Sequence, residues 1–428
     1  MKSLIILSFC LLFMLPVKAQ SEHDYEILLA KAGLFHLQKN PKNAIRLYEE
    51  ALKIKQPDAL TAYKIAGVYS LDGNAEKAFH YLNLALSAGW TEADWLSFDP
   101  YFDYLRENYS ERWNVIKQQS YVVEQQLEKR IVLPSLRREI NFMTLNDQKL
   151  RYEKIQNKED NRTEILDKAI QESDIKNLIR AKEIIKQYGW LKKSQIGKDG
   201  QNNLWLIVQH ADNDVLFQQE VLSEMKKLKA STEIDMENYA FLYDRVQCNL
   251  NYKQLFGTQV VWTNNGEASA FRPISEEYLA DVRRKELGLK PLAVYALNYG
   301  FSYDNLDAKE SKIKDSLYQD HVRILIDSAK YFYTKKQFQK TYDYYNTAST
   351  YLGGMSNENH FEAAIIFSKI AAENNEPQYK SIALDFLELN DLRKSLTKAQ
   401  LAKQNAFKTL YKEPRWVSLY NRLASFTF

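Results

Sequence analysis

A stretch near the N-terminus repeats with a period of 34 residues, and this repetition constrains the fold more than any other feature of the chain. Between Asp24 and Ser87, small and large residues recur at matching offsets. The recurring pairs are Ala32 and Ala66, Phe35 and Tyr69, Ala44 and Ala78, Tyr48 and Leu82, and Ala51 and Ala85. Small residues let two helices approach closely, and large ones fill the groove between neighbours. The period therefore predicts stacked antiparallel helix pairs.

These helix pairs resemble tetratricopeptide repeats. Two repeats leave an apolar face uncovered, so a cap is needed. The aromatic run that follows, which includes Phe102-x-x-Leu105 and Arg112-Trp113, predicts short helices that close the stack. We therefore expect a capped repeat unit at residues 20–128. The resemblance implies a groove for a protein or peptide partner, and the alternative is that the repeats only support the next domain.

A second repeat-like pattern occupies the C-terminal part of the chain. Between Val322 and Leu352, apolar residues return at the offsets of the first repeats, and a looser helical unit follows. Phe407-x-x-Leu410 and Arg415-Trp416 then reproduce the spacing of the first cap. These patterns predict a second tetratricopeptide-like unit at residues 299–428.

The N-terminal residues 1–19 have the form of a signal peptide. Lys2 supplies a positive start, the run from Leu4 to Leu15 is apolar, and Val17-Lys18-Ala19 carries small residues at the two positions that a signal peptidase reads. Cys10 lies inside the apolar run rather than after it, which argues against lipid attachment. No later segment approaches the roughly 18 apolar residues of a membrane span. We therefore predict cleavage after Ala19 and an exported, periplasmic or secreted protein without a membrane span.

Charge and cysteine content narrow the choice of function. The chain has 58 Lys and Arg against 55 Asp and Glu, a balance that does not predict nucleic-acid binding. Beyond the leader the only cysteine is Cys248, so neither an intramolecular disulfide nor a thiolate zinc cluster is expected. Cys248 itself is expected to be a small apolar filler rather than a nucleophile.

In the middle of the chain, a run of apolar residues is followed directly by residues whose side chains can transfer protons or form hydrogen bonds. Leu204 to Gln218 reads LWLIVQHADNDVLFQ. One continuous helix from Leu204 to Met225 would place His210 and Asp214 one turn apart, and we favour this interpretation. The alternative is a break, with Asp212 or Asn213 capping a helix that begins near Asp214.

Further polar residues surround this stretch in the sequence. Asp147 and Arg151 are spaced to form an ion pair on one helix face. Asn264-Asn265-Gly266 is a tight-turn signal that predicts a β-hairpin from Leu255 to Arg272. Helices are expected on both sides of the hairpin, at residues 238–247 and 275–287.

The ordered motifs of this region resemble a family of bacterial domains of unknown function. In chain order they are DQxxR, DxxN, YGW, WLIVQHADND with FQ, DRV, QLFGTQ and VRRxxLGLxPL. The resemblance places this domain at residues 129–298 and implies no established activity. The family commonly has Tyr where this chain has Phe256 and Pro where it has Leu191, so a mechanism that needs a phenolic hydroxyl at Phe256 is not expected.

The polar residues suggest a site whose members come from several elements. As an enzyme, the chain would use His210 as general acid or base with Asp214 or Asp244 as its partner, because His titrates near neutral pH. Residues expected to bind a small polar ligand are Asp147, Arg151, Gln209, Asp212, Arg245, Gln254 and Gln259. A metal site formed by His210, Asp214 and Asp244 is disfavoured, since one His with carboxylates is weak support. The structural alternative is a buried polar network that only fixes helix packing.

Together these patterns predict a mainly α protein in which tetratricopeptide-like repeats flank a helical middle domain with one β-hairpin. The leading functional hypothesis is an exported interaction protein of the cell envelope whose middle domain binds a ligand. The alternative is an envelope hydrolase or transferase that uses His210 on a small polar substrate. Neither GxSxG nor HExxH occurs, and the sequence implies no particular cofactor.

Overall fold

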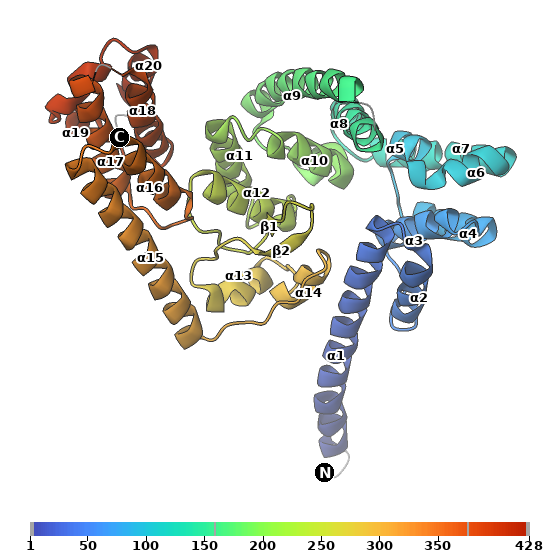
Figure 1. Cartoon of the computed structure of the whole chain (residues 1–428). Coiled ribbons are helices and arrows are strands. Elements are labelled where there is room, and N and C mark those ends of the chain that lie inside the picture. The colour runs from blue at the N-terminus through green and yellow to red at the C-terminus, as the bar shows by residue number, and fades with distance from the viewer. Residues whose placement is uncertain (1–3, 158–159, 375, 425–428) are drawn as a thin grey trace.

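The computed structural model describes residues 4–157, 160–374 and 376–424. In this part the chain is mainly α-helical and contains one two-stranded antiparallel sheet (Figure 1). Across these stretches, every helix is too short or too polar to cross a lipid bilayer. The predicted fold class, a mainly α protein with a single β-hairpin, is confirmed.

The N-terminal unit consists of two helix pairs. They are α1 (Leu4–Leu37) with α2 (Pro41–Leu52), and α3 (Ala59–Leu71) with α4 (Ala75–Ser87). Asn40 caps α2 and Asn74 caps α4 through side-chain bonds to backbone N–H groups, which fixes where each second helix begins. The recurring Ala44 and Ala78 are fully buried, so the 34-residue period reflects close helix contact. Residues 4–20 form the start of α1 but their side chains are not described, so cleavage after Ala19 stays a prediction.

Short helices close this first unit, as the aromatic run predicted. They are α5 (Ala93–Phe98), the 3-10 helix η1 (Pro100–Phe102), α6 (Asp103–Asn108) and the longer α7 (Ser110–Glu128). Phe102, Leu105 and Trp113 are all buried in one apolar core with the repeat helices. The cap thus covers the face that two helix pairs alone would leave exposed to water.

The middle of the molecule begins with a group of helices that share a second apolar core. They are α8 (Pro134–Gln156), α9 (Asp160–Tyr188), α10 (Lys193–Gln209), α11 (Val215–Lys227) and α12 (Met236–Asn249). α10 packs against both α8 and α9, and α11 packs against α12 (Figure 1). Leu204 and Val208 of α10 are fully buried, which explains the apolar run before His210.

The hairpin and its following helices complete this middle part. β1 (Val260–Trp262) pairs with β2 (Ala268–Phe271), and the register shifts between Val261 and Trp262. Gly266, at φ 76°, lies in the predicted turn and donates its N–H to the Thr263 carbonyl. The expected helix at residues 275–287 is divided into the 3-10 helix η2 (Glu277–Leu279) and α13 (Ala280–Glu286), and α14 (Leu292–Leu297) follows.

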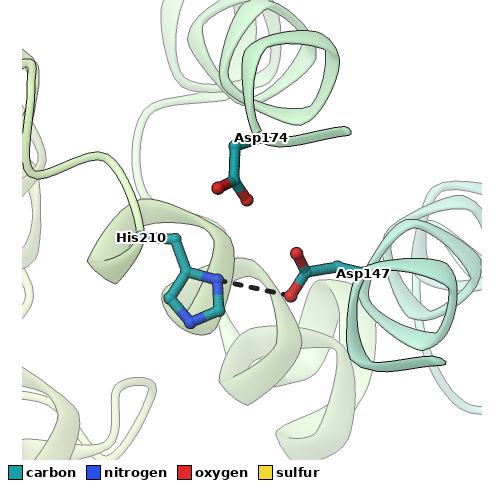
Figure 2. Close-up of side chains that lie close together, drawn as sticks. All are labelled: Asp147, Asp174 and His210. Atoms are coloured by element: carbon teal, nitrogen blue, oxygen red, sulfur yellow. Dashed lines mark ion pairs between the residues drawn. The ribbon is translucent and has the colours of Figure 1, made fainter. Parts of the chain in front are cut away.

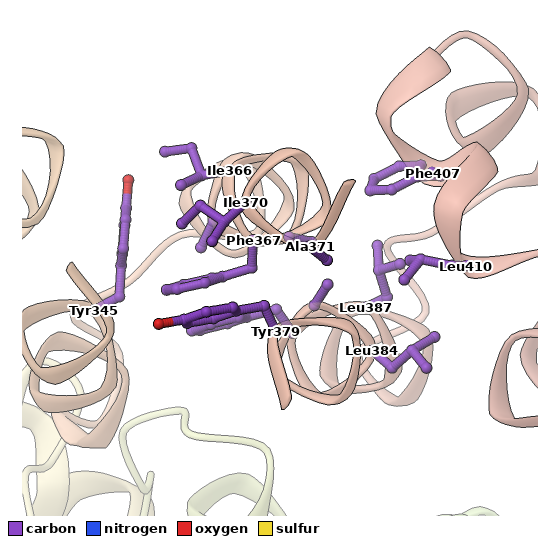
Figure 3. Close-up of a cluster of buried hydrophobic side chains, with 14 of the residues drawn as sticks. Tyr345, Ile366, Phe367, Ile370, Ala371, Tyr379, Leu384, Leu387, Phe407 and Leu410 are labelled. Carbon is purple, nitrogen blue, oxygen red and sulfur yellow. The ribbon is translucent and has the colours of Figure 1, made fainter. Parts of the chain in front are cut away.

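The C-terminal unit has its own apolar core and repeats the plan of the first unit. Its helix pairs are α15 (Ala308–Thr334) with α16 (Phe338–Thr350), and α17 (Asn357–Asn374) with α18 (Pro377–Leu392). It closes with α19 (Lys398–Ala402), the 3-10 helix η3 (Asn405–Leu410) and α20 (Pro414–Ala424). In Figure 3 the ring of Phe367 stacks on that of Tyr379, and Phe407 and Leu410 lie on the side of the two helices opposite Tyr345. The predicted second helical-repeat arrangement is therefore present.

Candidate functional site

The chain turns a corner immediately after α10, and this corner positions the residues of interest. α10 ends at Gln209, and α11 begins at Val215 with Asp214 as its N-cap, whose carboxylate accepts the N–H of Phe217 at 3.1 Å. The preferred expectation of one helix from Leu204 to Met225 is therefore wrong. The buried amide of Gln218 donates to the carbonyls of Val208 and Gln209 at 3.2 and 3.4 Å. These bonds give donors to the last carbonyl groups of α10, so the helix can end here without water or a further helical turn as the donor.

His210 lies at this corner and contacts a carboxylate from another helix. Its Nδ1 is 3.3 Å from Oδ2 of Asp147 on α8 (Figure 2). Asp147 also accepts the amide of Gln148 at 2.8 Å and Nε of Arg151 at 3.0 Å. Burial would raise the pKa of Asp147, but the hydrogen bonds from His210 and Arg151 outweigh burial and hold that pKa well below its ordinary value. Asp147 is therefore a carboxylate that orients the imidazole.

Asp174 on α9 completes the group around His210. Arg151 links the two carboxylates, because its Nη2 donates to Oδ1 of Asp174 at 2.6 Å. Burial raises the pKa of Asp174, although Arg151 opposes that shift. Asp174 was not among the predicted site residues. The DxxN motif that contains it, one of the ordered motifs of the domain, was the signal that could have included it.

Asp147, Asp174 and His210 also present ligand atoms within 4.8 Å of one another, the geometry of a small metal site. However, Arg151 already donates to both carboxylates, so a metal ion would have to displace a cation that is in place. The metal set of His210, Asp214 and Asp244, which the sequence disfavoured, is not assembled in the described chain. This arrangement suits an oriented imidazole better than a metal ion.

The carboxylates predicted to assist His210 have other partners. Asp214 caps α11 and forms an ion pair with Lys182. Asp244 is fully buried and accepts backbone N–H groups from Leu255, Phe256 and Thr258 at 2.7 to 3.1 Å. Neither has a hydrogen bond or ion pair with His210 in the described residues, so we withdraw their catalytic assignment. Both satisfy backbone donors, a role that sequence spacing does not distinguish from catalysis.

Gln254 is likewise a structural residue rather than a ligand-binding one. It is fully buried, its amide donates to the carbonyls of Gln259 and Arg272 at 2.9 and 2.7 Å, and its oxygen accepts the Gln259 N–H at 2.8 Å. These bonds tie together the two ends of the hairpin. All the amide atoms of Gln254 are thereby used inside the fold.

Two separate cavities hold the remaining predicted residues except Arg151, which pairs with Asp147 and Asp174 and lines neither cavity. A cavity of about 290 Å³, here called the histidine cavity, is lined by Asp147, Asp167, Ile170, Gln171, Asp174, Ile175, Asn177, Leu178, Ile207, His210, Ala211 and Asn213. A larger one of about 610 Å³, the arginine pocket, is lined by Gln209, Asp212, Phe241, Arg245, Cys248, Asn249, Thr258, Gln259, Val260, Val261, Trp262, Arg272 and Tyr299. Because the chain turns after α10, His210 lines the histidine cavity and Asp212 lines the arginine pocket. The residues predicted to form one site therefore line two separate cavities.

The lining of the arginine pocket includes a two-point ion pair. Arg245 on α12 donates through Nε and Nη2 to the two oxygens of Asp212, with Nε at 2.6 Å. Asn249 adds a bond to Asp212 at 3.1 Å. Burial would raise the pKa of Asp212, but Arg245 and Asn249 keep it below its ordinary value. Burial raises the pKa of the Cys248 thiol to about 11, so this residue is an uncharged filler, as expected.

The fold and the cavities define a helical-repeat protein whose middle domain lines the histidine cavity and the arginine pocket. Residues 134–304 of the chain match a family of unknown function, DUF6624. The domain expected at residues 129–298 is thus identified as one of unknown function. Neither the curated proteins nor the solved structures contain a match to this chain.

Proposed function

We propose that this protein is an exported interaction protein of the cell envelope whose middle domain binds a small polar ligand in the arginine pocket. One observation supports the ligand site above all others. Gln209, Asp212, Arg245 and Gln259 come from three separate segments and were expected to bind ligand, and all four line the same cavity of about 610 Å³. Pockets of this size, with a few convergent polar groups, suit small molecules.

Thermal-shift screening of the purified protein against envelope metabolites tests the ligand site. A compound that binds the arginine pocket raises the unfolding temperature of the wild type. Gln259→Ala should abolish that increase, whereas Gln339→Ala should retain it, because it removes an exposed glutamine on α16 whose side chain bonds to Asp343. An equal response in both variants would place binding elsewhere.

We propose that the repeats are tetratricopeptide repeats that bind a protein or peptide partner. The 34-residue period and the buried alanines support this assignment. Leu37 and Leu60 are 71% and 48% exposed and offer apolar contacts. Pull-down from envelope extracts should lose its partner when Leu60 is replaced by Glu. An unchanged partner list would indicate that the repeats only support the middle domain.

Export is proposed from the leader-like sequence at residues 1–19. Expression of the full gene in an exporting bacterium, followed by intact-mass measurement of the periplasmic protein, tests it. The expected mature protein begins at Gln20. A mass that retains the first nineteen residues would oppose this proposal.

A second candidate function is general acid or base catalysis by His210 on a small polar substrate. The contact of Nδ1 with Asp147 favours catalysis by His210. A carboxylate on one imidazole nitrogen orients the ring, and proton transfer to or from a substrate would then use the other nitrogen, Nε2. His210 also lines the histidine cavity. Mass-spectrometric detection of product from candidate metabolites should show turnover that His210→Gln removes while the unfolding temperature is kept. Turnover that survives in His210→Gln would exclude this role.

A further inference from the structure

The charges of the arginine pocket do not balance. Three charged side chains line it: Asp212, Arg245 and Arg272. Asp212 and Arg245 neutralise each other through their two-point contact. Arg272 has no carboxylate partner in the described chain, and its neighbour is the Cys248 thiol, which burial keeps protonated. The pocket therefore carries one uncompensated positive charge.

The position of Arg272 also favours the binding of an anion. Arg272 follows β2 directly, and its backbone is fixed by bonds to Gln259 and Gln254. These bonds fix the Cα of Arg272 at the base of the hairpin, and its side chain lines the pocket from there. Arginine binds carboxylate and phosphate groups through two parallel N–H bonds.

An aromatic side chain is exposed in the same pocket. Trp262 on β1 is 59% exposed, although an indole ring gains considerable free energy from burial. Tyr299 supports it from one side, with the ring centroids 6.0 Å apart at 74°. A flat ring stacked on Trp262 would remove this apolar surface from water. Gln209 lines the same pocket, and its buried Oε1 has no hydrogen bond within the described chain.

We propose that the arginine pocket binds a small molecule that carries an anionic group on a flat ring. Arg272 binds the carboxylate or phosphate, Trp262 stacks on the ring, and Gln209 and Gln259 bind neutral polar substituents. This inference rests on the proposed ligand-binding function and specifies the chemistry of its ligand.

Isothermal titration calorimetry with two probes tests the inference. Phenyl phosphate combines a ring with an anion, and benzyl alcohol presents a similar ring without charge. We expect phenyl phosphate to bind the full-length protein at probe concentrations up to about 10 mM, a weak-fragment range. Its affinity should exceed that of benzyl alcohol at least tenfold and should fall as salt is added.

Variants assign the binding to individual residues. Arg272→Gln should weaken phenyl phosphate at least about tenfold and leave benzyl alcohol unchanged, whereas Trp262→Ala should weaken both. The matched control is Arg323→Gln on α15, whose exposed side chain pairs with Asp320. It should bind both probes as the wild type does. Circular dichroism and unfolding temperature establish that each variant is folded.

Three outcomes would overturn the inference. Equal affinity for the two probes with no effect of Arg272→Gln would exclude the anion site and leave the proposed ligand pocket intact. Phenyl phosphate binding that Arg323→Gln weakens as much as Arg272→Gln would indicate a nonspecific charge effect. Failure of phenyl phosphate to bind refutes the stated ligand class, and the metabolite screen with Gln259→Ala then decides separately whether the pocket binds any ligand.

Discussion

Asp147 and Asp244 illustrate how two buried carboxylates in one domain acquire different roles. Asp244 is surrounded by backbone N–H groups of the segment that enters the hairpin, and it fixes that segment. Asp147 is surrounded by side chains, among them the imidazole of His210 and the guanidinium of Arg151. The chemical identity of the donors therefore separates a structural carboxylate from one that belongs to a cavity.

Replacement of Asp147 by Asn should destabilise the protein by about 1–3 kcal/mol at pH 7, because charge-assisted bonds to Arg151 and His210 are lost. The folded-state pKa of Asp147 is depressed, so its contribution is present in full above the unfolded-state pKa of about 3.9 and is lost progressively as pH falls from there through the folded-state pKa. Urea unfolding at pH 7 and at about pH 3 should therefore show a difference between variant and wild type that shrinks in acid.

The control for this experiment is Asp320→Asn, which removes an exposed ion pair with Arg323. It should change stability by less than about 1 kcal/mol at either pH. A destabilisation of Asp147→Asn that stays constant between the two pH values would contradict the assigned electrostatic role.

At the scale of elements, the corner between α10 and α11 decides the site. Asp214 was interpreted from the sequence as a partner of His210 one turn away, which requires a continuous helix. The helix ends because Asp214 and Gln218 together satisfy the backbone groups on both sides of the break. A local capping interaction thus outweighs the helical tendency of the apolar run.

The capping role of Asp214 makes a specific prediction. Asp214→Ala should lower the free energy of unfolding by about 1 kcal/mol, because the N–H of Phe217 loses its acceptor. Asp214→Ser should recover most of that loss, since a hydroxyl can also cap a helix. Urea unfolding measures both, and equal destabilisation by Ala and Ser would argue against capping.

Gly257 determines how the chain enters the hairpin. It has φ 70°, and a Cβ there would lie 2.6 Å from Leu292 Cδ2 and 2.9 Å from Ile274 Cδ1. Gly257→Ala should cost about 2–4 kcal/mol from backbone strain and overpacking combined. Gly266→Ala, at φ 76° but with nothing within 4 Å of its Cβ, should cost only the backbone part, about 1 kcal/mol. Thermal unfolding compares the two, and equal losses would show that packing at Gly257 is unimportant.

On the scale of the whole molecule, a buried arginine stands at each junction of the middle helices with a repeat unit. Arg137 of α8 reaches the Thr91 carbonyl at 2.8 Å and Glu124 of α7 at 2.8 Å, and it also binds Asp199 of α10. Arg393, just after α18, reaches the Leu250 carbonyl at 2.7 Å and the Asn251 carbonyl at 3.2 Å. Each guanidinium uses its several donors to join segments that are distant in sequence.

Arg393→Met should weaken the second junction. The buried Leu250 carbonyl would lose the Arg393 donor, and the Asn251 carbonyl would keep only the Gly353 N–H, at a cost of about 2–4 kcal/mol. Hydrogen exchange should then rise in α17, α18 and residues 250–252 before it rises in the N-terminal unit. Arg422→Met, which removes the partly exposed pair with Asp391, is the matched control and should leave exchange unchanged. A uniform rise across the chain would argue against a local junction.

The sequence by itself determined the periodic parts of this protein. The 34-residue spacing of alanines, the two caps built on Phe-x-x-Leu and Arg-Trp, and the Asn-Asn-Gly turn all predicted their elements, because local packing and turn chemistry depend on residues that are near one another in the chain. Of the predicted site, the Asp147–Arg151 pair was also readable, since both residues lie on one helix.

Only the tertiary structure decided how the polar residues are grouped. It joined His210 to Asp147 across two helices, assigned Asp214 and Asp244 to backbone donors, and sent Asp212 and Arg245 to a different cavity. These outcomes depend on where α8, α9 and α12 cross the corner after α10. Contacts between side chains of distant segments are set by the packing of whole apolar cores, which short-range patterns of residue type do not specify.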